Sequence, residues 1–512
     1  MQTDTHRSGR LKTSKAGFAK TSFASFAKIG KAGFTKTGFT AALLLFTCTA
    51  TAQTLTPEQK PEPVQPELPE LASDQPVWQP AEAASAPIQD IDEATLLARP
   101  QLLNLLLDKS VLRNDFDGIG VLLPVYRKLP SSNRDPILLQ LAESKLAMHQ
   151  GRFGEAVAGL RNLIAEKPEL NVIRMYLAIA LFYDRQDLAA KDQFTKLLAQ
   201  SDLPEPEKQA INRFLDELRQ SHRWQFSGGA NYTYEPNINN APIVKQQGNL
   251  DTRSQPESAH GVSYRIGAEK DWVLPHGFTA KFSTDIHGKH YPAHKQYNDL
   301  LVNTAAGIGY RNARFDAEIM PFVSKRWWRG GKEESGLKPY SESFGATLGV
   351  STRLDRRWRL NQYARIEKIN HEHRFRFDGI RRQTGHTLIY QSNPRQAWFG
   401  GLDFQRETLH DPDNSNHQWT ASLGWIQEWP KGFSTRTRAA WSKQTYHAPM
   451  PWPIQKTRKD RALQLNLSVW HRNIHFWGIT PRITWQHTRN KSNVFLYDYR
   501  KQNMFVEFSK TF

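Results

Sequence analysis

The chain has 512 residues, is 39% hydrophobic and carries a formal net charge of +18 from 68 basic and 50 acidic residues. It contains no apolar run of about 18 residues, which excludes a protein that crosses a membrane by helices. A basic balance is also typical of nucleic-acid-binding proteins. Here the basic residues fall in predicted strands and loops without a recognised binding motif, so no nucleic-acid partner is expected.

Residues 1–52 are predicted to be a signal peptide. A lysine-rich front precedes the apolar run 41–46, and the small residues 50–52 fit a cleavage site. The single cysteine, Cys48, lies in this segment, so the mature chain is expected to be stabilised by backbone pairing and packing without disulfides. Lipid modification of Cys48 is the alternative, but Phe46 and Thr47 match a lipidation signal poorly.

Residues 53–88 are predicted to be a linker. They hold eight prolines and charges that are mostly acidic, such as Glu58 and Glu62. A segment of this composition is expected to be extended and solvated, because it has too few apolar side chains to form a packed core.

Residues 89–220 switch to a helical period with repeats of tetratricopeptide type. Ala156 and Leu160 lie 34 residues before Ala190 and Phe194, which is the period of that repeat. Such repeats stack helix on helix. We therefore expect a buried core at the matching positions, and a closing helix over 207–219. The core positions are Leu177, Ala178, Leu181, Ala190, Phe194 and Leu197.

A stack of helical repeats offers a concave groove. In the better repeat its lining is predicted to be Met175, Ile179, Phe182 and Tyr183, which are the candidate cargo-binding residues of this domain. The alternative is that these side chains only pack helix on helix and bind nothing.

Residues 222–512 alternate apolar and polar side chains in segments of about ten residues, which is typical of a transmembrane β-barrel. In the first segment Trp224, Phe226 and Tyr232 lie on one face, and Gln225 and Asn231 on the other. We predict about 14 strands, at 224–234, 262–272, 278–288, 300–310, 314–324, 343–352, 358–368, 384–391, 397–406, 419–429, 433–441, 461–470, 476–486 and 503–512. The predicted fold is an α + β multidomain chain, with a tetratricopeptide-like α-helical domain before an antiparallel outer-membrane barrel.

The predicted connections alternate between tight turns and long loops. Barrels of this class keep short turns in the periplasm and long loops outside the cell. An even strand number places both barrel ends, and hence the helical domain, in the periplasm. The tight turns are 274–277, 311–313, 354–357, 430–432 and 471–473, and the long loops include 235–261, 325–342, 369–383, 407–418, 442–460 and 487–502.

The densest basic run lies within 353–383. We interpret it as an electropositive loop or lumen wall that faces water or lipopolysaccharide phosphates. The alternative is that these arginines line a pathway for an acidic cargo. They are Arg356, Arg357, Arg359, Arg374, Arg376, Arg381 and Arg382.

No enzyme, metal site or cofactor site is predicted. The histidines of 287–294 and 371–373 resemble metal ligands, but they lie in or beside long loops and no HExxH or cysteine pair accompanies them. No nucleophile, base and orienting group stand at a spacing that predicts a hydrolase.

The domain order resembles Slam, the surface lipoprotein assembly modulators. The segment 234–240, with Asn237 and Asn239, is similar to the exit of the first barrel strand in that family. The last strand, with Phe508 and Phe512, looks like the signal read by the barrel-assembly machinery, although Lys510 replaces the usual aromatic residue. The resemblance implies that Asn237 and Asn239 contact cargo and that the two phenylalanines direct membrane assembly.

The resemblance implies an outer-membrane translocon that moves lipoproteins from the periplasm to the cell surface, and also secreted proteins in some relatives. Its implied partners are surface lipoprotein cargo, outer-membrane lipid, the barrel-assembly machinery and periplasmic chaperones. Two alternatives stay open. An exopolysaccharide exporter predicts rows of aromatic and carboxylate side chains along the lumen, whereas a passive porin-like channel predicts conductance without a periplasmic partner.

Overall fold

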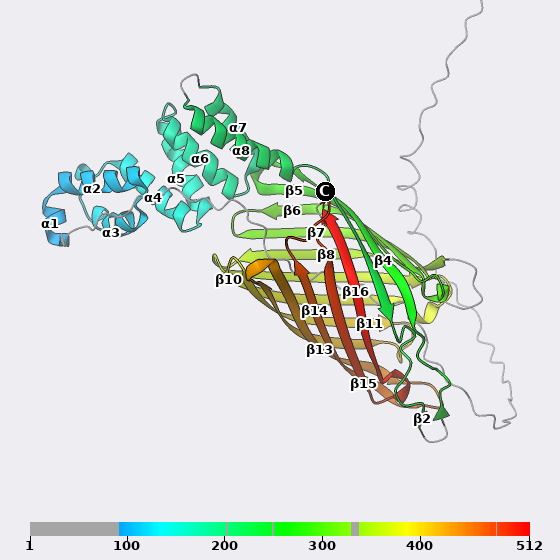
Figure 1. Ribbon diagram of the computed structural model, residues 1–512. Coiled ribbons are helices and arrows are strands. Elements are labelled where there is room, and N and C mark those ends of the chain that lie inside the picture. The colour runs from blue at the N-terminus through cyan, green and yellow to red at the C-terminus, as the bar shows by residue number, and fades with distance from the viewer. Residues whose placement is uncertain (1–91, 201–202, 248–249, 329–336, 478, 512) are drawn as a thin grey trace, which may run out of the picture. The chain divides into compact units, whose positions relative to one another are not determined.

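A computed structural model describes residues 92–512, apart from 201–202, 248–249, 329–336, 478 and 512 (Figure 1). The predicted signal peptide, 1–52, and the predicted linker, 53–88, lie outside the described residues. Phe512 also lies outside them. The described part of the chain comprises a helical region that begins at Glu93 and the barrel that comes after it.

Eight α-helices precede the barrel within the described residues. Asp92, Asp115 and Asp135 accept hydrogen bonds from backbone N–H groups in the first turns of their helices, which satisfies donors that a helix start leaves free. Pro100 and Pro136 stand at helix starts, where a missing N–H costs nothing. The helices are α1 Glu93–Ala98, α2 Pro100–Arg113, α3 Phe116–Tyr126, α4 Pro136–His149, α5 Phe153–Glu166, α6 Asn171–Tyr183, α7 Asp187–Leu198 and α8 Glu205–Ser221.

Three of the helix–helix turns place one residue in the left-handed backbone region. These residues are Asn114 (φ 55°), Gly151 (φ 76°) and Arg185 (φ 62°), and each directly precedes the N-cap of the next helix. Positions 151 and 185 are one repeat length of 34 residues apart (185 − 151 = 34). Glycine and asparagine tolerate this conformation, whereas for other residues it costs roughly 1–2 kcal/mol. Arg185 therefore holds a strained position.

The core of the helical region confirms the predicted repeat packing. All six predicted core side chains, from Leu177 to Leu197, are at most 2% exposed. The closing helix α8 extends by two residues beyond each predicted end and buries Ile211 and Leu218 against the same core. The repeat pattern thus defined the packing correctly.

Lys145 on α4 is a cation inside this helical core. It is 2% exposed, and its Nζ donates to the carbonyl of Val111 and to the hydroxyl of Tyr176 at 3.0 Å. Burial lowers the pKa of Lys145 to about 8. Burial also raises the pKa of Tyr176 above its usual value of about 10.

We expect the helical region to gain about 2 kcal/mol of stability between pH 8 and pH 10. The folded pKa of Lys145 lies below the unfolded one, so in this range the unfolded state binds more protons and stability rises with pH. Above pH 10 the raised pKa of Tyr176 reverses the trend. Thermal melting of the helical signal at 222 nm, recorded with the full chain in detergent, measures the effect.

The variant Lys145→Met is expected to flatten this pH dependence and to raise the melting temperature at pH 8, because it removes the buried charge. Lys109→Met is the matched control, since Lys109 is exposed on α2. A Lys145→Met protein that kept the slope of the unmodified chain would contradict this explanation.

The barrel contains 14 antiparallel strands and is closed, as predicted (Figure 1). Each strand pairs with its neighbours in sequence, and β1 also pairs with β16. Two short strands, β2 Gln246–Gln247 and β3 Leu250–Asp251, form a separate hairpin in the loop after β1. The barrel strands are β1 Gln225–Glu235, β4 Ala259–Val273, β5 Phe278–His290, β6 Asp299–Arg311, β7 Phe315–Trp328, β8 Lys338–Arg353, β9 Trp358–His371, β10 Gly379–Asn393, β11 Gln396–Leu409, β12 Asn416–Glu428, β13 Phe433–Pro449, β14 Thr457–His471, β15 Arg482–Ser492 and β16 Tyr499–Thr511.

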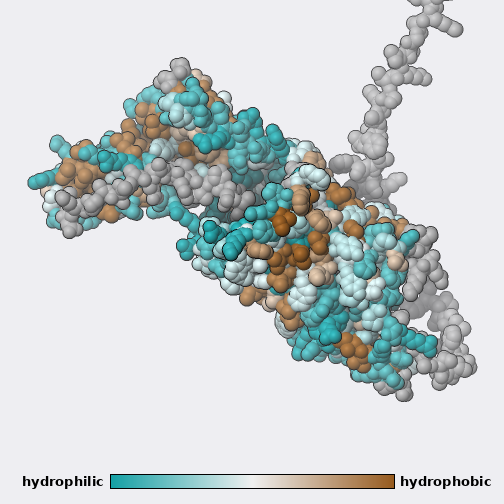
Figure 2. Space-filling model, viewed as in Figure 1, coloured by the Kyte–Doolittle hydropathy of each residue, from teal (hydrophilic) through white to brown (hydrophobic). Residues whose placement is uncertain are grey.

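The predicted two-faced strands are present. Apolar side chains such as Tyr232, Ile266 and Leu423 are more than half exposed and point outward. Apolar residues gather on part of the outer barrel face that is visible in Figure 2. Their strand neighbours, such as Asn231 and Arg265, point to the opposite, inward face. Among the described residues, no helix is long and apolar enough to span a bilayer.

Several predicted strand ends need correction. Most strands continue past the predicted ends on the long-loop side, so the loop predicted over 487–502 shrinks to 493–498 and the one over 442–460 to 450–456. The strand predicted at 476–486 is wrong by about half its length, because β15 runs from Arg482 to Ser492. The connection before it, 472–481, is correspondingly longer than the tight turn that was predicted. We call the end of the barrel opposite the long loops the short-turn end.

Candidate functional site

The inward face of the barrel is the first candidate site, and it is mainly polar. One cross-strand row, in which paired residues share a face, begins at Glu269 on β4 and ends at Tyr446 on β13. Large aromatic side chains such as Trp419 and Trp441 are half exposed on the outer face instead. The members of the row between its ends are Ser283, Ala305, Phe322, Gly345, Glu367, Arg381, Glu407 and Asn416.

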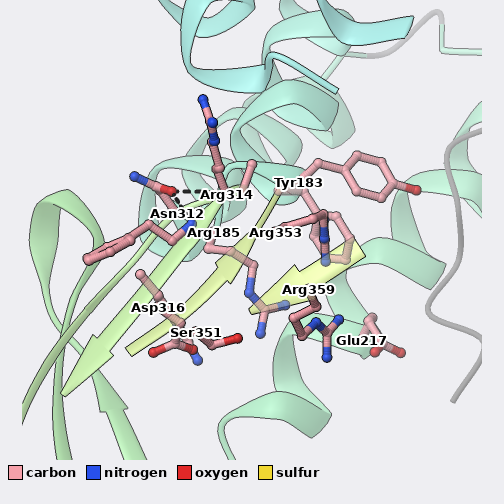
Figure 3. A pocket seen from close by; sticks show the side chains of 13 residues that line it. Tyr183, Arg185, Glu217, Asn312, Arg314, Asp316, Ser351, Arg353 and Arg359 are labelled. Atoms are coloured by element: carbon pink, nitrogen blue, oxygen red, sulfur yellow. Dashed lines mark hydrogen bonds between the residues drawn. The ribbon is translucent and has the colours of Figure 1, made fainter. Parts of the chain in front are cut away.

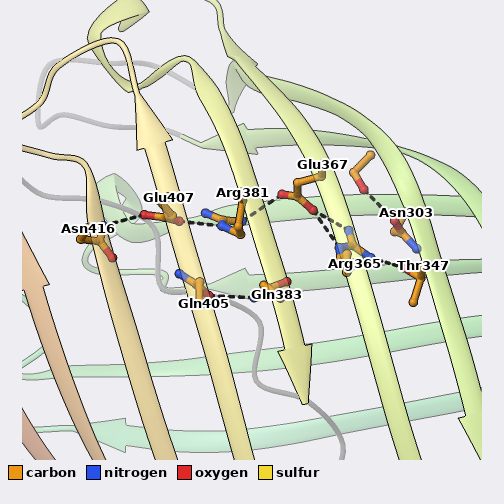
Figure 4. Close-up of polar contacts among 10 residues, drawn as sticks. Asn303, Thr347, Arg365, Glu367, Arg381, Gln383, Gln405, Glu407 and Asn416 are labelled. Carbon is orange, nitrogen blue, oxygen red and sulfur yellow. Dashed lines mark hydrogen bonds and ion pairs between the residues drawn. The ribbon is translucent and has the colours of Figure 1, made fainter.

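Part of this row, together with Arg365 on β9, forms a continuous belt of charged and amide groups (Figure 4). Arg381 on β10 lies between Glu367 on β9, at 2.9 Å, and Glu407 on β11, at 2.6 Å. Arg365 donates to the second oxygen of Glu367 at 2.8 Å, and Asn416 donates to the second oxygen of Glu407 at 3.0 Å. Each carboxylate therefore has a partner on both sides, as buried charges require.

Other inward-facing charged side chains of the barrel are also paired with a group of opposite charge. Arg265 contacts Asp285 at 2.9 Å, and Lys281 contacts Glu318 at 2.6 Å. Such pairs neutralise the wall locally, so its surface is hydrophilic without a large field of one sign at these strands.

A cavity of ≈ 230 Å³ is the second candidate site (Figure 3). It lies where the turn between α6 and α7 meets strand ends of the barrel at the short-turn end. Arg185 enters it from the helical region, whereas Arg353 and Arg359 enter it from β8 and β9. Phe182 and Tyr183 also line it, so two of the four cargo-binding residues predicted in the helical domain are part of this cavity.

A buried ion pair joins the helical region to the barrel beside this cavity. Asp187, the first residue of α7, is 3% exposed, and its Oδ2 lies 2.9 Å from a guanidinium nitrogen of Arg311 at the end of β6, which is 6% exposed. Asp184 accepts a hydrogen bond from the backbone N–H of Ala313 at 3.4 Å. Arg356 also donates to the carbonyl of His149. Sequence reasoning missed this junction, because its members are far apart in the chain.

The variant Asp187→Asn is expected to weaken this junction by about 1 kcal/mol, since the amide keeps an acceptor oxygen but loses the charge. Hydrogen exchange at the start of α7, measured in the full chain, reports the loosening. Asp192→Asn is the control, because the carboxylate of Asp192 is exposed and contacts only its helix neighbours Gln193 and Lys196. Equal exchange in both variants would contradict a role for the buried pair.

All four predicted groove residues contribute to the helical core. Ile179 and Phe182 are each 8% exposed, and Met175 and Tyr183 pack against the same core while staying partly exposed. The ring of Tyr183 stacks on Phe153 with a centroid distance of 5.1 Å. Cargo binding by these four residues stays a prediction, and the exposed parts of Met175 and Tyr183 are the surfaces available for it.

Asn237 and Asn239 lie in the long loop after β1, where both brace the backbone. Asn237 is 6% exposed, accepts from the N–H of Ala241 at 2.7 Å and donates to its carbonyl. Asn239 donates to the carbonyl of Gln255 at 2.7 Å and accepts from the N–H of Glu257. The two side chains therefore hold the loop, and their predicted contact with cargo is untested.

Phe508 lies on β16 and is 42% exposed on the outward face, where it pairs with Ala230 of β1. Its partner in the predicted assembly signal, Phe512, lies outside the described residues. The signal therefore stays a prediction. Two of the histidines that resemble metal ligands make hydrogen bonds: His371 with Asp378 at 3.1 Å and His290 with Asn298 at 3.3 Å. In the part of the chain that the structure describes, no group of three or more His, Cys, Asp or Glu side chains could hold a metal ion.

Two family models match this architecture. Residues 224–512, which contain the whole barrel, match the model described as surface lipoprotein assembly modifier. Residues 89–194 match the model for the N-terminal TPR repeats of the same proteins. The chain belongs to the surface lipoprotein assembly modifier family. It is an outer-membrane protein with an N-terminal helical domain, and this fold and family indicate a transport or assembly role.

Curated relatives cover most of the chain. It is 37% identical over 451 residues to a surface lipoprotein assembly modifier of Pasteurella multocida, covering 85% of this chain and 87% of that protein. It is also 37% identical over 423 residues to surface lipoprotein assembly modifier 1 of Haemophilus influenzae, covering 82% and 87%. A hemophilin secretion modulator of Acinetobacter baumannii is 24% identical over 438 residues, covering 80% and 86%.

Proposed function

We propose that this protein is an outer-membrane translocon that moves lipoproteins from the periplasm to the cell surface. The observation that carries the proposal is a closed barrel of 14 strands whose polar inward face is fused to a helical repeat domain. A barrel of this size encloses a lumen wider than its side chains fill. We infer lipoproteins as the cargo from the names of the relatives, which are surface lipoprotein assembly modifiers.

The charge pairs of the inward wall support passage of a hydrated polypeptide. Groups that already have partners, such as Arg381 with Glu367 and Glu407, have little free energy to gain from binding a passing chain. The outward placement of Trp419, Trp441 and similar side chains disfavours an exopolysaccharide exporter, which needs aromatic rows in the lumen.

The helical domain is proposed to capture cargo in the periplasm, at the short-turn end of the barrel. The partly exposed faces of Met175 and Tyr183 offer apolar area for an unfolded segment. The cavity at Phe182 and Tyr183 lies next to the barrel strands, so captured chain would be close to the lumen. The relative named as a hemophilin secretion modulator extends the proposed cargo to secreted proteins.

Surface display in cells tests this function. Epitope-tagged lipoproteins are expressed with and without this protein, and protease shaving of intact cells measures the exposed fraction. The exposed fraction is expected to rise at least about tenfold when the protein is present, while a periplasmic marker stays protected. Equal exposure in both strains, or channel conductance without any display, would favour a passive channel.

A further inference from the structure

The cavity between the α6–α7 turn and the barrel is strongly basic. Its lining has five arginines and only two acidic residues, Glu217 and Asp316. The belt in the barrel wall differs, because each of its two arginines, Arg365 and Arg381, is paired with at least one carboxylate. The arginines of the cavity are Arg185, Arg311, Arg314, Arg353 and Arg359.

Four of these cations lack side-chain partners. Within the residues that the structure describes, the guanidinium groups of Arg185, Arg314, Arg353 and Arg359 make no hydrogen bond or ion pair, whereas Arg311 is held by Asp187. Figure 3 shows Arg185 and Arg359 reaching into the same space from the helical region and from β9. Guanidinium groups that share a cavity and outnumber its carboxylates, with none of the carboxylates paired to them, favour binding of an anion.

Arg185 is kept at this place in spite of its backbone. It stands in the left-handed region where the preceding repeat has Gly151, and that conformation is unfavourable for arginine. Burial, and then the nearby charge of Arg311, lower the pKa of Arg185. The charged form of Arg185 is therefore unfavourable at this place in addition to its backbone conformation. Residues that keep strain of this kind cluster at functional sites.

We propose that Arg185, Arg353 and Arg359 bind a carboxylate-rich segment of the transported polypeptide at the entrance of the barrel. The proposal rests on the translocon function and names a chemical feature of its cargo. The planar fork of arginine binds carboxylates through two parallel hydrogen bonds. Tyr183 beside the cavity adds an aromatic surface for the neighbouring part of the chain.

The placement of the strand arginines favours a peptide over a lipid phosphate. Arg353 pairs with Arg359 across β8 and β9, and both share the inward face with Ser351 and Asn361. The outward face at the same level is apolar, with Leu354 47% exposed. A headgroup of the surrounding membrane would lie on that outer side, so it would not reach the inward guanidinium groups.

Binding of fluorescent hexaglutamate to the full chain in detergent tests the proposal by fluorescence anisotropy. The unmodified protein is expected to bind it in a salt-sensitive manner. The dissociation constant is expected to rise at least about tenfold in Arg185→Gly and in the double variant Arg353→Gln, Arg359→Gln. Arg213→Gln, an exposed arginine on α8, is the control and should bind as the unmodified chain does.

Two variants distinguish the loss of the Arg185 side chain from the change in backbone strain. Arg185→Gly is expected to raise the melting temperature of the helical domain while it weakens peptide binding. Gly151→Arg introduces the same strain into open space one repeat earlier, so it should lower the melting temperature and leave binding unchanged. A gain of stability together with a loss of binding is not the result of misfolding.

The proposal is overturned if hexaglutamate binds equally to all variants, or if inorganic phosphate or anionic lipid nanodiscs compete with it more strongly than free hexaglutamate does. Its failure is distinguishable from failure of the proposed function. If lipoprotein display still depends on this protein while hexaglutamate does not bind, only the acidic-segment inference falls. If display does not depend on the protein, the translocon proposal falls.

Discussion

Replacing Arg381 by methionine is expected to destabilise the barrel by roughly 3 kcal/mol, the lower end of the cost of breaking a buried ion pair. The change leaves Glu367 and Glu407 without the cation between them, and Glu367 is only 5% exposed. The lower end applies because Arg365 and Asn416 still contact the two carboxylates. Denaturant unfolding in lipid vesicles, followed by tryptophan fluorescence, measures the loss.

Two further variants make this result specific. Adding Glu367→Gln and Glu407→Gln to Arg381→Met removes the unpaired charges and is expected to restore at least half of the stability. Arg382→Met is the matched control, since Arg382 is exposed on the opposite face of the same strand and its loss should change stability by less than about 0.5 kcal/mol. Equal effects of Arg381→Met and Arg382→Met would contradict the belt.

Deleting the helical region, residues 92–221, is expected to reduce lipoprotein display at least about tenfold while the barrel still assembles. The barrel closes through its own strand pairs and needs no helix for its hydrogen bonds. Display would fall because the proposed capture surface and the arginine cavity are lost together. Protease shaving of intact cells gives the displayed fraction, and heat-modifiable migration on gels reports a folded barrel.

The deletion needs a milder counterpart, because removal of a domain can affect export. Arg311→Met keeps the whole chain but leaves Asp187 buried without its partner. It is expected to reduce display in the same direction and by a smaller factor. Normal display by the barrel alone would exclude cargo capture by the helices, even if the barrel itself proved necessary.

Periodicity predicted most of this fold, because strands and repeats each impose a spacing on apolar residues. The alternation of Trp224, Phe226 and Tyr232 with polar neighbours is a local property, and a barrel strand requires it along its whole length. The core of the helical repeats was likewise predicted from positions 34 residues apart. Both patterns arise because apolar side chains are kept away from water, by membrane lipid in the barrel and by the protein core in the repeats.

Strand ends were predicted less well, because backbone pairing continues into water beyond the apolar band. Residues of β13 beyond the predicted end at 441, such as Lys443 and Gln444, still pair with β14 although their side chains are polar. The misplaced strand before β15 has another cause. Trp477, Ile479 and Ile483 alternate in sequence with small or polar residues as in a strand. The first two lie in a turn, where Ile479 pairs with Phe476 and Trp477 is 89% exposed.

The junction and the arginine cavity could not be predicted, since no periodicity connects their members. Asp187 and Arg311 are 124 residues apart and meet only in three dimensions. One local signal was available. Aligning the two repeats places Arg185 opposite Gly151, and an arginine at a position that favours glycine could have been noticed as an exception.

The seam between β1 and β16 has a consequence for biogenesis. Every other pair of neighbouring barrel strands is consecutive in the chain and can form as a hairpin. The pairs Ser227–Thr511 and Tyr234–Met504 join the first and last barrel strands, so they can form only after all the strands between them are in place. Until β1 and β16 pair, the growing sheet has two edge strands with unpaired backbone N–H and C=O groups. The hydrocarbon core of the membrane cannot solvate these groups. Closure of the barrel by pairing of β1 with β16 is therefore a late and cooperative step, and the two edge strands must be protected until it occurs.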